Sequence, residues 1–153
     1  MEGRSKLVLL IARLILAVVF IYAAWTKLSA PWPVFAVSIN SYQVVPLGWL
    51  EPIARTLPWF ELLLGVMLAT GILLRWVAAA GTGLLGFFFV LMVRSYLIGL
   101  KIDCGCFGPG DELGPKTLLR DGVLLALSAY VAIGAFLANR KPEQLYDPAR
   151  RVN

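Results

Sequence analysis

The sequence predicts an all-α, polytopic membrane protein: a four-transmembrane-helix bundle whose N- and C-termini are both cytoplasmic. Of the 153 residues, 59% are hydrophobic and 15% are charged, whereas a soluble domain is about 25% charged. The mean hydropathy is +0.79, so that much of the apolar surface must face lipid. Four apolar stretches have about the 20 residues that a helix needs to cross the hydrocarbon core. This composition excludes a soluble enzyme, a disordered chain and a nucleic-acid-binding protein of ordinary type.

A single membrane domain is expected over residues 7–138, with spans at about 7–28, 57–74, 76–100 and 118–138. Arg4 and Lys6 precede the first span, as they would precede a secretory signal. The apolar stretch is longer than the about 7–15 residues of such a signal, so we interpret it as an uncleaved span. The connection between the second and third spans is so short that they form an antiparallel hairpin.

Two loops follow the first and third spans and lie at the same end of the bundle. The loop at 29–56 contains Pro31, Pro33, Pro46 and Pro52, which cannot occupy a helix interior. We therefore expect it to break into pieces, with a short interfacial helix between the prolines. The second loop, 101–117, carries a Cys-Gly-Cys run, and 139–153 is expected to be a cytoplasmic tail.

The distribution of basic residues predicts which side each loop occupies. The termini and the hairpin connection together carry seven Lys and Arg, against five on the opposite side. Because basic residues are retained in the cytoplasm, the termini are predicted to be cytoplasmic. We expect a multi-pass protein of the bacterial inner (cytoplasmic) membrane with the cysteine loop on the periplasmic side.

Cys104 and Cys106, the only cysteines, flank Gly105 in that loop. Outside the cytoplasm a cysteine pair is usually a redox feature. At this spacing the pair satisfies the Cα separation of a disulfide, and Gly105 is free to adopt a positive φ. So small a ring gains little from loop closure, which favours thiol-disulfide exchange over a structural role. The attacking cysteine is expected to be the more exposed one.

Three alternatives to exchange stay open for the pair: a structural clip in the loop, a metal site and simple coincidence. We predict no metal, because two thiolates in a chain without histidine leave a tetrahedral ion short of ligands. Asp103 is expected to oppose thiolate formation at its neighbour, whereas Arg94, Lys101 and Arg120 favour it.

Several charged residues lie inside the spans, where an unpaired charge is costly. Counted along the alternating helix directions, they fall near the outer ends, beneath the cysteine loop: Lys27, Glu61, Arg94, Arg120 and Asp121. We expect Glu61 to pair with Arg94 or Lys27, and Asp121 to pair with another basic residue. These pairs would hold the helices in register or orient the cysteine loop.

Four features of the chain together resemble a known family. They are Lys27 at the end of the first span, the Glu-Leu-Leu-Leu-Gly run at 61–65, the Cys-Gly-Cys-Phe-Gly run at 104–108 and the Leu-Arg-Asp run at 119–121. The chain is similar in these features to the methylamine utilisation protein MauE family, part of the DoxX-like group of small four-helix membrane proteins. The resemblance covers roughly 7–138, and the cysteine run with the later Arg-Asp is its most specific part.

The resemblance implies a redox-associated role in the maturation of periplasmic redox proteins. It leaves open whether this chain is itself a thiol-disulfide oxidoreductase or an accessory to one. It puts the exchanging pair at Cys104 and Cys106, with a periplasmic thioredoxin-like protein or a secreted client as partner. It does not transfer methylamine as the pathway. Membrane lipid is a further expected partner, and nucleic acid is not.

The same group supplies the alternative function. Some DoxX-like proteins are subunits of quinone-linked respiratory complexes. The alternative is therefore that this chain is a non-catalytic assembly subunit, bound to other membrane-complex subunits. Its cysteines would then form a structural clip in the loop. No cofactor is predicted. A bound quinone is the weaker alternative, because the chain has neither a second thiol pair nor any histidine.

Overall fold

The computed structural model describes residues 2–107 and 110–140. Within this part of the chain it contains isolated β-bridge pairing between Asp103 and Glu112 but no strand. The helices are α1 (Glu2–Ser29), α2 (Trp32–Ser41), α3 (Leu47–Thr70), α4 (Leu74–Leu97) and α5 (Pro115–Arg140). Four of them are long and apolar enough to cross a membrane: α1, α3, α4 and α5. The all-α fold class with four potential spans is therefore confirmed. Most of the predicted tail, from residue 141 onward, lies outside the described residues.

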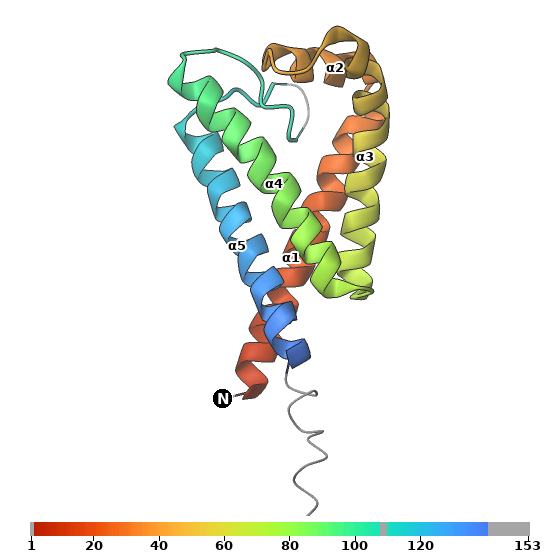
Figure 1. Cartoon of the computed structure of the whole chain (residues 1–153), viewed down its shortest axis with the longest axis vertical. Helices are drawn as coiled ribbons and strands as arrows, with labels where there is room; N and C mark the ends of the chain where they lie inside the picture. The colour runs from red at the N-terminus through yellow and green to blue at the C-terminus, as the bar shows by residue number, and fades with distance from the viewer. Residues whose placement is uncertain (1, 108–109, 141–153) are drawn as a thin grey trace, which may run out of the picture.

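The long helices are arranged as two packed pairs (Figure 1). α1 packs most extensively against α3, and α4 packs most extensively against α5. α1 and α5 also contact each other and close the bundle. The start of α1 and the end of α5 lie at one end, whereas α2 and the cysteine loop lie together at the other end.

The short helix α2 crosses the end of the bundle (Figure 1). Pro31 precedes it and Pro33 lies in its first turn, where the missing N–H has no helical acceptor to lose. The buried side chains of Phe35, Ala36 and Ile39 form a small cluster with Ala54 of α3. This cluster holds α2 in place across the end of the bundle.

One expectation about the first loop is wrong: Pro52 does not break it. α3 begins at Leu47, ahead of the predicted 57–74 span, and runs through Pro52 and Pro58 to Thr70. A proline in a helix interior costs about 3 kcal/mol because a backbone hydrogen bond is lost. Packing of this first part of α3 against α2 offsets that cost.

The hairpin between the second and third spans also differs in register from the expected one. α3 ends at Thr70 and is capped by Gly71, whose φ of +80° is left-handed and whose N–H donates to the Met67 carbonyl. Such a residue is a common helix stop. α4 then begins at Leu74, so the connection is 71–73 and Arg75 and Trp76 belong to α4.

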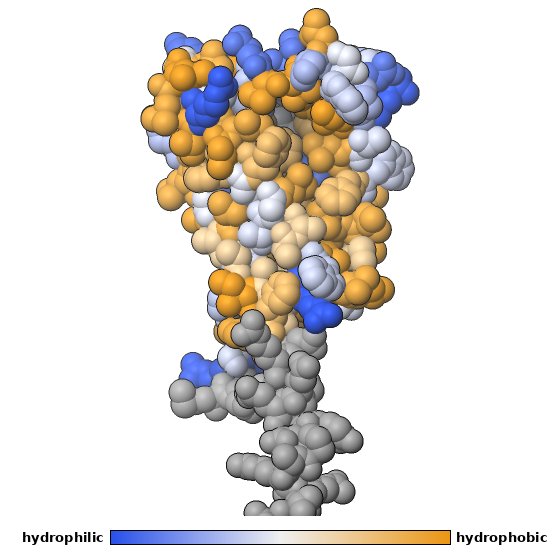
Figure 2. Space-filling view, in the orientation of Figure 1, coloured by the Kyte–Doolittle hydropathy of each residue, from blue (hydrophilic) through white to orange (hydrophobic). Residues whose placement is uncertain are grey.

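The bundle has an apolar core and an apolar outer surface. Leu16 and Phe20 of α1 pack with Leu64 and Leu68 of α3 and with Val131 of α5. Many large apolar side chains stay exposed on the flanks, and hydrophobic residues cover the side of the molecule in Figure 2, while hydrophilic residues gather toward the end with α2. A lipid environment accounts for this distribution.

Candidate thiol site at the end of the bundle

The loop between α4 and α5 doubles back on itself and carries the cysteines beneath α2. The Cys104 N–H donates to the Asp111 carbonyl at 2.9 Å, and the Leu113 N–H donates to the Ile102 carbonyl at 2.8 Å. Gly105 at the turn has a φ of +68°. A Cβ on Gly105 would lie 2.9 Å from the Cβ of Ser38 in α2. Only glycine therefore allows this turn to pack so closely on α2.

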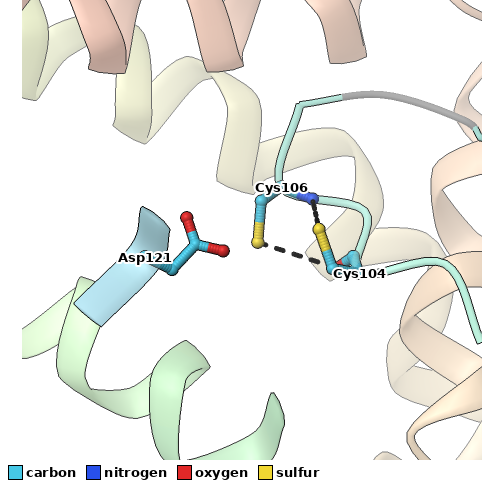
Figure 3. A group of neighbouring side chains, drawn as sticks. All are labelled: Cys104, Cys106 and Asp121. Atoms are coloured by element: carbon cyan, nitrogen blue, oxygen red, sulfur yellow. Dashed lines mark hydrogen bonds between the residues drawn. The ribbon is translucent and has the colours of Figure 1, made fainter. Parts of the chain in front are cut away.

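Both cysteines are free thiols, and they lie side by side (Figure 3). Cys104 is 2% exposed, and Cys106 is partly exposed. The Cys106 N–H donates to the Cys104 Sγ at 3.3 Å, and the Cys106 thiol donates to the Cys104 carbonyl at 3.7 Å. The two sulfur atoms therefore share one small site.

The two thiols differ in acidity. The hydrogen bond from the Cys106 side chain lowers the pKa of Cys104, although burial and Asp111 act in the opposite direction. The same hydrogen bond raises the pKa of Cys106 well above its usual value, and burial raises it further. The more exposed cysteine, Cys106, is thus not the one whose pKa is lowered.

Arg120, in the first turns of α5, connects the helix to the loop. Its Nη2 atom lies 2.8 Å from Asp111 Oδ2 and 3.1 Å from Asp121 Oδ2. It also lies 3.9 Å from the Cys104 Sγ, and the guanidinium sits 4.4 Å from the ring centre of Phe107. Asp121 thus finds its expected basic partner in its own sequence neighbour.

Lys27 and Glu61 form a buried ion pair below the loop. The Lys27 Nζ lies 2.8 Å from Glu61 Oε2, and the two side chains are 3% and 7% exposed. The same Nζ donates to the Cys106 carbonyl at 2.8 Å. Of the two partners expected for Glu61, the structure selects Lys27, and this ion pair also holds the cysteine loop.

Arg94 occupies a different place from the one expected. Its Nη1 donates to the Tyr42 carbonyl at 3.4 Å, and the Tyr42 hydroxyl donates to the Cys104 carbonyl at 2.7 Å. Burial raises the pKa of Tyr42 above its usual range, so the phenol stays a neutral donor. Tyr42 was not expected from the sequence, because nothing local marks a tyrosine just after α2 as a neighbour of Cys104.

The acidic neighbour of the thiols is also not the one expected. The Asp103 carboxylate accepts the Gly110 N–H at 3.2 Å and thereby braces the loop. The Cys104 Sγ instead contacts Asp111 Oδ2 at 3.2 Å. The sequence does not show that Asp111 lies beside Cys104. The two are brought together because the loop folds back antiparallel to itself, with a bridge between Asp103 and Glu112.

A small pocket of about 40 Å³ opens beneath the loop, inside the bundle. Cys106, Lys27, Glu61 and Asp121 line its polar end, and apolar side chains such as Phe20 line the rest. The partly exposed surface of Cys106 therefore includes a wall of this pocket.

Comparison with known proteins identifies the family. The family model described as methylamine utilisation protein MauE matches residues 5–136, which include the whole thiol site. A curated relative, the methylamine utilization protein MauE of Paracoccus denitrificans, is 32% identical over 133 residues, which are 85% of this chain and 71% of the relative. No solved structure matches the chain. The resemblance inferred from the sequence is confirmed, and the chain belongs to the MauE family.

Proposed function

We propose that this chain is an accessory membrane protein that supports disulfide formation in periplasmic redox proteins through thiol-disulfide exchange at Cys104 and Cys106. The observation that carries the proposal is the pair of free thiols packed together in a polar site at the end of a membrane bundle. The family name suggests methylamine utilisation as the setting. The partner is a periplasmic thioredoxin-like protein or a secreted client.

The proposed side of the membrane follows from the arrangement of the ends. The cysteine loop lies opposite the start of α1 and the end of α5 (Figure 1). The bias of basic residues toward the termini favours a cytoplasmic location for that end. The loop would then face the periplasm, where no cytosolic thiol buffer keeps the pair reduced.

The exchange reaction balances without any further cofactor. A client thiolate attacks one sulfur of the oxidised Cys104–Cys106 disulfide, forms a mixed disulfide and releases the other cysteine. The second client thiol then attacks the client's sulfur in the mixed disulfide. The client leaves with a new disulfide, and this chain keeps two electrons and two protons as the dithiol. The disulfide of a thioredoxin-like partner reoxidises the pair by the same steps in reverse.

The surrounding residues support this role by fixing the loop backbone. The Lys27 ammonium holds the Cys106 carbonyl, and the Tyr42 hydroxyl holds the Cys104 carbonyl. The Cys106 N–H donates to the Cys104 Sγ at 3.3 Å, which favours that sulfur as a leaving thiolate. Arg120, 3.9 Å from the same sulfur, partly offsets the nearby Asp111 carboxylate. Both carbonyl contacts restrain the short segment that carries the sulfurs.

The test combines a redox titration with a client assay. The midpoint potential of the pair, measured by alkylation in intact membranes, is expected at about −120 to −200 mV, as for thiol oxidants and isomerases. Cys104→Ser and Cys106→Ser are each expected to lower the disulfide content of the periplasmic client. The proposal would be overturned by a midpoint potential below about −300 mV together with an unchanged disulfide content of the client in both variants. That result would favour an assembly subunit whose cysteines form a structural clip.

A further inference from the structure

A carboxylate from another element approaches the two thiols. Asp121, in the first turns of α5, points its carboxylate toward the Cys106 sulfur (Figure 3). The ligand atoms of Cys104, Cys106 and Asp121 all lie within 4.8 Å of one another. The sequence predicts no metal because two thiolates alone leave the ion short of ligands. In the folded chain Asp121 provides a third ligand atom.

The spacing of these three atoms is close to that of a tetrahedral zinc site. Zinc binds sulfur at about 2.3 Å and carboxylate oxygen at about 2.0–2.2 Å, so its ligands lie about 3.5–3.8 Å apart. The three ligand atoms therefore have to approach one another by about 1 Å, which small side-chain rotations supply. Cys106 and Asp121 both line the pocket beneath the loop, which leaves room for water as a fourth ligand.

The neighbouring groups fit a bound cation. Two thiolates and the Asp121 carboxylate carry three negative charges, and Asp111, whose Oδ2 lies 3.2 Å from the Cys104 Sγ, adds a fourth. Arg120 contacts both carboxylates, at 2.8 Å and 3.1 Å, so Arg120 and a divalent ion together offset three of these four charges. The Cys106 N–H already donates to the Cys104 Sγ at 3.3 Å. Such outer contacts orient ligands and stabilise charged sulfur in metal sites.

We propose that the reduced chain binds one zinc-class divalent cation through the sulfurs of Cys104 and Cys106 and the carboxylate of Asp121. Two thiolates select a borderline-soft ion of this class over Mg²⁺ or Ca²⁺. Binding releases the two thiol protons and transfers no electrons. A disulfide between the cysteines removes both thiolates, so the metal and the disulfide exclude each other. The site does not depend on the proposed exchange function.

The experiment uses the full chain, purified in detergent, reduced and stripped of metal. Zn²⁺ is titrated against a chromophoric chelator, and Co²⁺ is added separately to observe a thiolate-to-metal charge-transfer band. One ion per chain is expected, and none for the oxidised protein. Asp121→Asn is expected to weaken Zn²⁺ binding by at least about tenfold. The matched control is Glu112→Gln, because Glu112 lies in the same loop with an exposed side chain, and this variant is expected to bind Zn²⁺ like the wild type.

A second measurement does not require any variant to fold. Bound Zn²⁺ is expected to protect both cysteines of the wild-type protein from alkylation, and a chelator is expected to restore their reactivity. The proposal is overturned if the reduced protein takes up no stoichiometric metal, or if a folded Asp121→Asn variant binds as tightly as the wild type. Neither result bears on client oxidation, so the two proposals fail separately.

Discussion

At the residue scale, Lys27 joins the helix bundle to the cysteine loop through a single ammonium group. It is buried, pairs with Glu61 and donates to the Cys106 carbonyl. Moving two charges out of water is costly, and their attraction offsets that cost only when the geometry is good and other hydrogen bonds are satisfied. The carbonyl of the cysteine loop supplies one of those hydrogen bonds. Loop position and bundle stability are therefore coupled at this residue.

The first prediction removes the lysine charge. Lys27→Met leaves the Glu61 carboxylate buried without its partner, and we expect the bundle to lose about 3–5 kcal/mol of stability. The free energy of unfolding is measured by denaturant titration of the protein in mild detergent. The double variant Lys27→Met with Glu61→Leu is expected to regain most of this loss, because no uncompensated charge remains.

A matched control comes from the exposed pair of Arg55 and Glu51, whose side chains are 55% and 56% exposed. Arg55→Met is expected to change stability by less than about 1 kcal/mol, as is usual for a surface ion pair. Equal effects of Lys27→Met and Arg55→Met would contradict the importance of burial at Lys27.

The second prediction concerns which thiol ionises first. The hydrogen bond from Cys106 lowers the pKa of Cys104, and a serine hydroxyl at 106 can still donate it. A lowered pKa means that the thiolate persists to lower pH. In the presence of a chelator, alkylation of Cys106→Ser, which retains Cys104, is therefore expected to reach half its maximum rate at a lower pH than alkylation of Cys104→Ser. The comparison uses the pH of the midpoint, so unequal access of the reagent cancels. The opposite order would show that the Cys106 thiol, and not the Cys104 thiol, ionises at the lower pH.

At the scale of elements, α2 and the cysteine loop support each other. The loop approaches so closely that a Cβ on Gly105 would meet the side chain of Ser38 at 2.9 Å. The Tyr42 hydroxyl, just beyond α2, then caps the Cys104 carbonyl. The helix therefore acts as a rigid support for the segment that carries the thiols.

The third prediction separates this contact from backbone conformation alone. Gly105→Ala introduces both an unfavourable positive φ, which costs about 1–2 kcal/mol, and a clash with α2. Gly110 has a φ of +87°, but nothing lies within 4 Å of the position that a Cβ would occupy there, so that Gly110→Ala introduces the conformational cost alone. We expect Gly105→Ala to increase alkylation of the buried Cys104 several-fold more than Gly110→Ala does. Equal increases would show that packing on α2 does not hold the loop.

The same elements show how far the sequence could predict the fold and the site. Hydropathy located the four long helices, because lipid-facing helices must be apolar over their whole length. The alternating helix directions were enough to predict that the charged residues lie near the outer ends of the spans. Glu61 pairs with Lys27, one of the two partners expected for it. Pro52 was misinterpreted, because packing of α3 on α2 outweighs a local proline penalty.

The site itself was predicted only in part, for a different physical reason. The cysteines could be identified from their spacing, but their neighbours depend on contacts between distant segments. Tyr42 contacts Cys104 from just beyond α2, and Asp111 contacts it from the returning part of the loop. Such contacts are set by how elements pack, and no local pattern in the chain encodes them.

At the scale of the whole molecule, the fold separates two chemically different ends. The α3–α4 turn lies at the end away from α2, and the cysteine loop lies at the end that α2 covers (Figure 1). This second end also holds the groups that contact the loop, which are Arg120 and the Lys27–Glu61 pair. Hydrophobic flanks lie between the two ends (Figure 2). A membrane therefore places the two ends in different compartments, and the side that receives α2 decides whether the thiols meet oxidising partners.

The last prediction tests that orientation with reporter cysteines in a chain that carries Cys104→Ser and Cys106→Ser. Gly48→Cys lies at the α2 end, with open space around it, and Ile72→Cys lies in the α3–α4 turn, 57% exposed. A membrane-impermeant maleimide added to intact spheroplasts is expected to label Gly48→Cys at once and Ile72→Cys only after permeabilisation. Denatured samples provide the control for total reactivity. The reverse pattern would place the natural thiols in the cytoplasm, where reducing buffers would keep the pair from oxidising a client.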